Sequence, residues 1–115
     1  MTPFPAIDLT DGHRRLVTQI LRQHLPAASR VWVVGSRATG RARPYSDLDL
    51  AIDAGQYLTL DQLAILREAF EESDLPFTVD LIDWAAADDR FRSLSAGERR
   101  PLIAPEHPLD PGGAR

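Results

Sequence analysis

Apolar positions recur at helical spacing in the first part of the chain and predict a helix there. The residues Leu16, Val17, Ile20, Leu21 and Leu25 lie on one side of such a helix. Thr10 or Asp11 can cap its start, and Pro26 ends it. The run 30–34 that follows is Arg-Val-Trp-Val-Val, whose bulk and β-branching are typical of a buried strand.

Two later segments change from the helical period to strict alternation, which predicts strands. In the second strand, 48–53, the apolar residues Leu48, Leu50 and Ile52 alternate with acidic or small ones. A third strand is predicted over 77–84, with Asp80 on the face opposite its apolar residues. Between these strands, Thr59 and the following residues predict a helix that starts with a capping box, and another helix is predicted over 88–98.

This order of elements predicts an α+β domain in two layers. We expect a mixed, mostly antiparallel sheet, with helices packed on one face and acidic side chains gathered on the other. Residues 1–100 are assigned to this domain. Residues 101–115 hold four of the nine prolines and two glycines, so they are expected to form a tail that is disordered or docks on a partner.

Composition narrows the possible functions. With 115 residues the chain has room for one such domain and none for a separate acceptor-binding domain, so an acceptor must come from elsewhere. The chain has no cysteine, and its thirteen basic residues are all arginine, which excludes a Walker-type lysine. The net charge of −4 argues against binding a nucleic-acid template. No apolar run is long enough to span a membrane, and a cytoplasmic protein is expected.

The segment 35–50 carries the candidate chemistry. Gly35 and Ser36 end the first strand in a turn whose N–H groups can face an anion, and ten residues separate Ser36 from Asp47. Asp47 and Asp49 then point to the same side of the second strand, two residues apart. A glycine turn for phosphates next to paired carboxylates indicates nucleotide chemistry.

Three carboxylates in this pattern fit the handling of a nucleoside triphosphate. Mg²⁺ prefers one or two protein carboxylates together with phosphate oxygens and water, and Asp47 and Asp49 supply them. Nucleotidyl transfer uses a second ion, and Asp80 is predicted either to hold that ion or to take the proton of the attacking hydroxyl. Gly35 and Ser36 are predicted to orient the triphosphate.

These residues resemble the DNA polymerase β-like nucleotidyltransferase superfamily, whose signature is Gly-Ser, a spacer of about ten residues and Asp-x-Asp. More closely, GSRATGRARPYSDLDLAI with VDLIDW is similar to the minimal nucleotidyltransferases, or MntA-type antitoxins. The resemblance covers residues 30–84. It implies the nucleotidyltransferase fold, Gly35 and Ser36 as nucleotide-binding residues, and Asp47, Asp49 and Asp80 as catalytic metal ligands. It further implies transfer of AMP from ATP, with Mg²⁺, to a tyrosine of a partner HEPN-domain toxin.

Two other functions are compatible with the sequence. The chain could be a non-catalytic antitoxin that neutralises its partner by binding, although a pure binder has no need for three carboxylates. It could also be an adenylyltransferase for a small molecule of the antibiotic type, although such enzymes usually have more chain for the acceptor. The arginines at 37, 41 and 43 are expected in a solvated loop rather than on the triphosphate, and Trp32 and Trp84 in the core or at a partner.

Overall fold

The computed structural model describes residues 7–103, which form four strands and four helices in an α/β order. The elements are α1 Asp11–His24, β1 Arg30–Val34, α2 Ser36–Thr39, β2 Leu48–Asp53, α3 Leu60–Glu71, β3 Val79–Asp83, the 3-10 turn η1 Trp84–Ala86, α4 Asp89–Ala96 and β4 Arg100–Ile103. The first two strands have the predicted bounds. No helix in the described part of the chain is long and apolar enough to cross a membrane.

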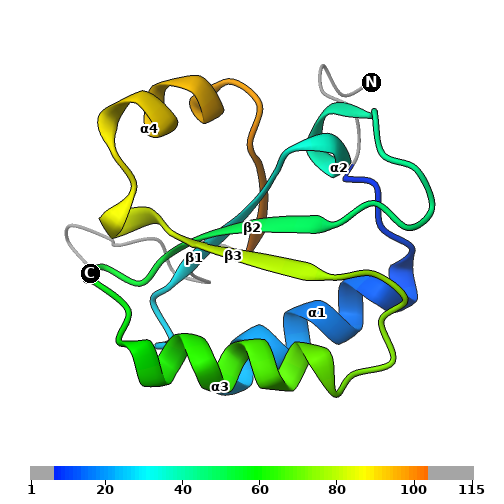
Figure 1. Ribbon diagram of the computed structural model, residues 1–115, viewed down its shortest axis with the longest axis horizontal. Helices are drawn as coiled ribbons and strands as arrows, with labels where there is room; N and C mark the ends of the chain where they lie inside the picture. Colours follow the sequence, from blue (N-terminus) through cyan, green and yellow to red (C-terminus); the bar gives the residue numbers. More distant parts are fainter. Residues whose placement is uncertain (1–6, 104–115) are drawn as a thin grey trace, which may run out of the picture.

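The strands form one sheet in the order β3-β2-β1-β4 (Figure 1). β1 pairs antiparallel with β2 and with β4, while β2 pairs parallel with β3. The parallel pair requires a crossover, which α3 provides between β2 and β3. The predicted mixed, mostly antiparallel sheet is therefore confirmed.

Side-chain caps fix where the two long helices begin. The Thr10 side-chain oxygen accepts a hydrogen bond of 3.0 Å from the backbone N–H of His13 at the start of α1. At the start of α3, Thr59 accepts from the N–H of Gln62 at 3.0 Å, and the Gln62 side chain accepts from the N–H of Thr59 at 2.8 Å. The capping box predicted from the sequence is present, because both partners find the free donors of the first turn.

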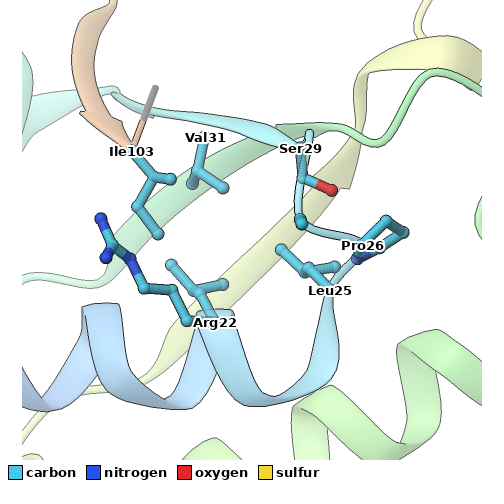
Figure 2. A pocket seen from close by; sticks show the side chains of 8 residues that line it. Arg22, Leu25, Pro26, Ser29, Val31 and Ile103 are labelled. Carbon is cyan, nitrogen blue, oxygen red and sulfur yellow. The ribbon is translucent and has the colours of Figure 1, made fainter. Parts of the chain in front are cut away.

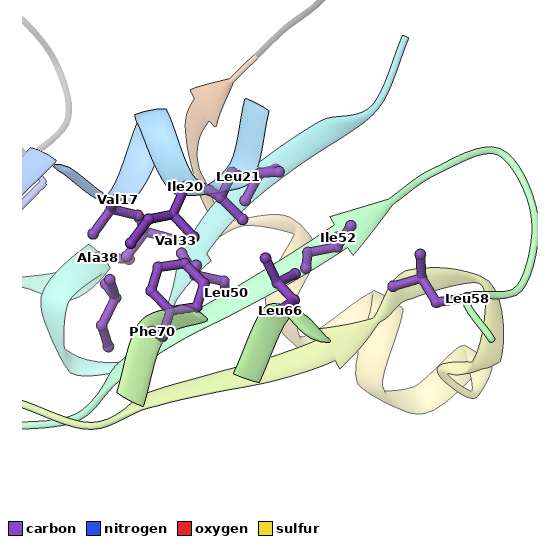
Figure 3. Close-up of a cluster of buried hydrophobic side chains, with 12 residues drawn as sticks. Val17, Ile20, Leu21, Val33, Ala38, Leu50, Ile52, Leu58, Leu66 and Phe70 are labelled. Atoms are coloured by element: carbon purple, nitrogen blue, oxygen red, sulfur yellow. The ribbon is translucent and has the colours of Figure 1, made fainter. Parts of the chain in front are cut away.

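The main core lies between the sheet and the pair α1 and α3, which Figure 1 shows together below the sheet. Figure 3 shows side chains from both helices meeting those of the strands. Val17 and Leu21 of α1 and Leu50 and Ile52 of β2 are fully buried, and Leu66 of α3 is 1% exposed. The strict alternation in β2 thus directs its leucines and isoleucine to this layer and leaves its aspartates on the other face.

The fourth helix lies on the opposite face of the sheet, where the sequence analysis placed no helix (Figure 1). Trp32 of β1 points to this face, and its ring centroid is 5.2 Å from that of Trp84. Phe91 of α4 packs edge-on against Trp84 at 6.1 Å. Burying these large rings away from water stabilises the position of α4. Both tryptophans therefore belong to a second, smaller cluster of buried and half-buried side chains.

The sequence analysis missed β4. Arg100–Ile103 pairs with β1 as an edge strand, so the domain extends past the boundary predicted after residue 100. Pro101 concealed this strand, because proline lacks the N–H that a central strand needs and is tolerated only at an edge or a bulge. The ladder is shifted between Val31 and Trp32, beside that proline. The rest of the predicted tail, 104–115, lies outside the described residues.

Two neighbouring residues of α3 give a test of this packing. Leu66→Ala removes a side chain from the core and should lower the free energy of unfolding by about 2–5 kcal/mol. Ile65→Ala, at a side chain that is 52% exposed, should cost no more than about 1 kcal/mol. Denaturant unfolding of the two variants measures the difference, and equal losses would contradict the described orientation of α3.

Candidate active site

The glycine turn and two of the predicted carboxylates lie in a row across three neighbouring strands. In the register of the sheet, Val34 of β1 faces Asp49 of β2, and Asp49 faces Asp80 of β3. Gly35 follows Val34 directly, so the turn, Asp49 and Asp80 come from consecutive strands. Asp47 lies just before β2 and is exposed. Residues 45 positions apart in the chain are thus gathered at one place.

Gly35 is required by the geometry of this row. Its φ of +75° lies where L side chains are rarely found, and a Cβ atom built on it would lie 2.5 Å from Oδ2 of Asp49. No real Cβ atom approaches an oxygen so closely. The sequence analysis explained this glycine by the approach of a phosphate. In the structure the group that already fills the space is the carboxylate of Asp49.

The short helix α2 follows the turn. The Gly35 carbonyl accepts a hydrogen bond of 3.0 Å from the N–H of Ala38 and one of 3.3 Å from the Thr39 hydroxyl. The first N–H groups of a helix, here those of Ser36 and Arg37, have no acceptor within the helix. Ser36 is half-buried, and its side chain adds a hydroxyl group to the turn. The arrangement suits the predicted contact of Gly35 and Ser36 with phosphate oxygens.

Crowding of the carboxyl groups changes the acidity of Asp49. Its pKa is raised from 3.8 to about 6, first because burial disfavours the charged form. The negative charge of Asp80, a hydrogen bond between the Asp49 and Asp80 carboxyl groups, and the charge of Asp47 raise it further. All three predicted carboxylates therefore share one electrostatic site.

The donor set is compatible with a divalent cation. Within residues 7–103, no three acidic or histidine side chains stand in a ready-made metal cluster. Mg²⁺ does not need one, because it usually takes one or two carboxylates and completes its shell with substrate phosphates and water. Asp49 and Asp80 are adjacent carboxylates, and a bound cation would relieve their mutual repulsion. Asp47 and Asp49 remain the predicted ligands for the nucleotide-bound ion.

Arg37 has a role that sequence reasoning missed. It was expected in a solvated loop, but it is only 5% exposed, and its guanidinium donates hydrogen bonds to three carbonyl groups. These are the carbonyls of Asp8 at 2.7 Å, Pro44 at 3.1 Å, and Ser46 at 2.9 and 3.1 Å. The guanidinium also stacks over Phe77, 4.3 Å from the ring centroid. Arg37 thus holds the loop that leads into Asp47.

The rest of that loop is a turn on the surface, as predicted. Ser46 donates its N–H to the carbonyl of Arg43, and its hydroxyl accepts from the N–H of Arg43 at 2.8 Å. The side chains of Arg41 and Arg43 belong to exposed residues, and Tyr45 is 76% exposed. Ser46 therefore shapes the turn before the first predicted ligand.

Two hollows border the row of site residues. One, of about 310 Å³, lies between the sheet and α4; Gly35 and Asp49 line it on one side, and Phe91 and Leu94 on the other. The second, of about 560 Å³, opens at the β3 edge and includes Asp80. The hollow in Figure 2 lies elsewhere, where the end of α1 meets the start of β1 and the end of β4. It is mostly apolar and holds none of the predicted site residues.

Comparison with known proteins connects this geometry to one family. Residues 16–104 match the family model described as polymerase β, nucleotidyltransferase. Over 94 residues, 82% of each chain, the sequence is 45% identical to the Haemophilus influenzae protein named "Probable protein adenylyltransferase MntA".

Solved structures show the same fold. One is a toxin–antitoxin crystallised with AMP-PNP, with a TM-score of 0.70 and 22% identity over 81% of this chain and 74% of that one. Another is the Shewanella oneidensis tri-AMPylated HEPN toxin in complex with MNT antitoxin, where the TM-score is 0.63 and the identity 21% over 79% and 69% of the two chains. The matched segment contains β1, the glycine turn, and all three aspartates. The chain belongs to the polymerase β-like nucleotidyltransferases and, within them, to the MntA-type minimal nucleotidyltransferases.

Proposed function

We propose that this protein transfers AMP from ATP to a hydroxyl group, that of a tyrosine, on a partner HEPN-domain toxin, and so acts as the antitoxin of a pair. The observation that carries the proposal is the row formed by Gly35, Asp49 and Asp80 across β1, β2 and β3. A decayed, purely binding antitoxin would have no reason to keep a carboxylate whose pKa is raised to about 6 by burial and by its acidic neighbours.

Mg²⁺ is the cofactor that we propose for this site. Asp47 and Asp49 would hold the ion that accompanies the triphosphate, and Asp80 would complete a two-ion site. When bound, Mg²⁺ neutralises the charge on the transferring phosphoryl group and on the leaving pyrophosphate. Mg²⁺ and ATP are both abundant in the cytoplasm, where we place the reaction.

The chain's own residues mainly position the reactants. The turn at Gly35 and Ser36 offers its N–H groups and a hydroxyl to the phosphate oxygens, which orients the triphosphate. Asp80 lies on the far side of Asp49 from this turn, where it can accept the proton of an incoming hydroxyl. Arg37 keeps the Asp47 loop in place through its carbonyl contacts. Phosphoryl transfer needs little further chemistry from the protein, because positioning and charge neutralisation supply most of the rate.

The proposal of a protein acceptor rests on the relatives. The Haemophilus influenzae relative is named a protein adenylyltransferase, and a solved neighbour contains an AMPylated HEPN toxin with its MNT antitoxin. A small-molecule acceptor is the second candidate function, and modification of a small hydroxyl compound by this protein alone would favour it.

The transfer itself can be tested by intact mass spectrometry. The partner toxin is taken as the product of the gene next to the one that encodes this protein. After incubation with this protein, ATP and Mg²⁺, it should gain the mass of one or more AMP units. Asp47→Asn should abolish the gain, because the variant loses a charged metal ligand while keeping its shape. Asp53→Asn, at the far end of β2, is the matched control, because its carboxylate accepts a hydrogen bond from the N–H of Gly55 outside the row of site residues, and this variant should remain active. Unchanged mass with the wild type, while a complex still forms, would favour the purely binding antitoxin.

The role of Asp80 in turnover can be tested separately from nucleotide binding. Asp80→Asn should slow turnover by about 10²–10⁴-fold, the usual contribution of a general base, while the Kd for an ATP analogue changes little. Single-turnover transfer rates and titration calorimetry measure the two quantities. An unaltered rate would remove Asp80 from the site.

The raised pKa of Asp49 predicts a gain of stability when its charge is removed. Because the folded-state pKa is about 6 and the ordinary value is 3.8, Asp49 supports the fold fully below about pH 3.8 and loses this support as the pH rises through 6. Asp49→Asn should therefore raise the Tm at pH 8, and the gain should shrink as the pH falls to about 4. Thermal unfolding in the presence of a chelator measures this. A lower Tm at pH 8 would show that Asp49 has a stabilising partner instead.

A further inference from the structure

An apolar hollow lies at the start of β1, whereas the candidate active site lies at the end of that strand. We call it the α1–β4 hollow; it has a volume of about 250 Å³. Leu25, directly after α1, lies across it from Val31 of β1 and Ile103 of β4 (Figure 2). Because apolar walls are disfavoured in contact with water, a hydrophobic group that filled this hollow would stabilise the fold.

One polar group in the lining calls for a partner. Ser29 is only 3% exposed, and within residues 7–103 its side-chain oxygen makes no hydrogen bond. Its backbone N–H is already used, because it donates to the carbonyl of Pro26 at 3.0 Å. A buried hydroxyl without a partner is unfavourable. The group that fills the hollow should therefore bring a hydrogen-bond acceptor to the Ser29 hydroxyl.

The chain itself continues from the wall of this hollow. Ile103 is the last described residue, and residues 104–115 follow it. In the antiparallel register of β1 and β4, Val31 faces Ile103, so each later residue of the chain meets an earlier residue on the β1 side. Two residues further on, Pro105 would face Ser29. The segment after β4 is thus directed along the lining of the hollow.

The alternation of side chains selects Pro105 as the residue that reaches inward. Ile103 points into the hollow, and in an extended chain residue 105 points to the same side. An extended backbone is favoured here, because Ala104 precedes a proline. Proline also has an apolar ring and no N–H, so its burial leaves no donor without a partner.

We propose that residues 104–106 continue along the β1 side of the sheet and that the ring of Pro105 fills the α1–β4 hollow. A backbone carbonyl of this segment accepts the hydrogen bond that the Ser29 hydroxyl lacks among the described residues. The docked segment lengthens the edge strand and closes the apolar core at the end of β1 that is far from Gly35. The inference does not depend on the proposed function.

Replacing the ring tests this docking. Pro105→Ser should lower the Tm of the full chain by about 4–8 °C, a shift typical of one lost stabilising contact in a domain of about 100 residues. Pro108→Ser is the matched control, because both substitutions change the unfolded chain alike and only residue 105 shares the side of Ile103. Thermal unfolding measures both variants. Equal Tm values would overturn the proposal, and they are the result expected if a segment of another protein fills the hollow instead.

A designed disulfide tests the register independently of stability. The chain has no cysteine, so Ser29→Cys combined with Pro105→Cys introduces its only thiols. Facing residues of antiparallel strands have Cα atoms about 4.5–5.5 Å apart, which suits a disulfide. This pair should oxidise at least tenfold faster than the control pair Ser29→Cys with Pro108→Cys. Thiol alkylation followed by intact mass spectrometry measures the two rates. Similar rates, or no disulfide in either protein, would overturn the proposal.

Discussion

The close approach of Asp49 to Gly35 is the constraint on which the site depends. The Asp49 carboxylate occupies the space where a side chain at position 35 would begin, 2.5 Å from a Cβ atom built there. The turn after β1 and the aspartate of β2 can therefore be neighbours only if residue 35 is glycine. Because β2 also pairs with β3, Asp80 lies beside Asp49 on the side away from the turn. One backbone position without a side chain thus lets the turn after β1 lie against the carboxylate of Asp49.

The grouping of carboxylates on one face of the sheet destabilises the fold, and the apolar core on the other face offsets this loss. Burial of Asp49, together with the nearby carboxylates of Asp80 and Asp47, raises the pKa of Asp49 to about 6, so near neutral pH the fold holds a charge that it disfavours. On the opposite face, α1 and α3 bury a continuous apolar cluster against the same strands (Figure 3). Functional sites commonly break local rules in this way, and the core supplies the stability that permits it.

Arg37 shows how a buried charge can serve the site without touching a reactant. Its guanidinium has no acidic partner among its described contacts, and three backbone carbonyls, one before α1 and two in the loop before Asp47, accept its hydrogen bonds instead. Burying an arginine is unfavourable unless its N–H groups are hydrogen-bonded, so the loop must keep its carbonyl groups directed at Arg37. The loop that precedes Asp47 is thus fixed by the residue that follows Ser36, and the turn and the first predicted ligand are set together.

The sequence by itself determined the elements whose signals are local. Alternation placed Asp49 on the face opposite Leu48 and Leu50, a capping box set the start of α3, and the Gly-Ser and Asp-x-Asp spacing indicated the chemistry. Only the tertiary structure decided the side on which α4 packs, the pairing of β4 with β1, and the burial of Arg37. These depend on contacts between segments far apart in the chain, for which neither periodicity nor local propensity gives a signal.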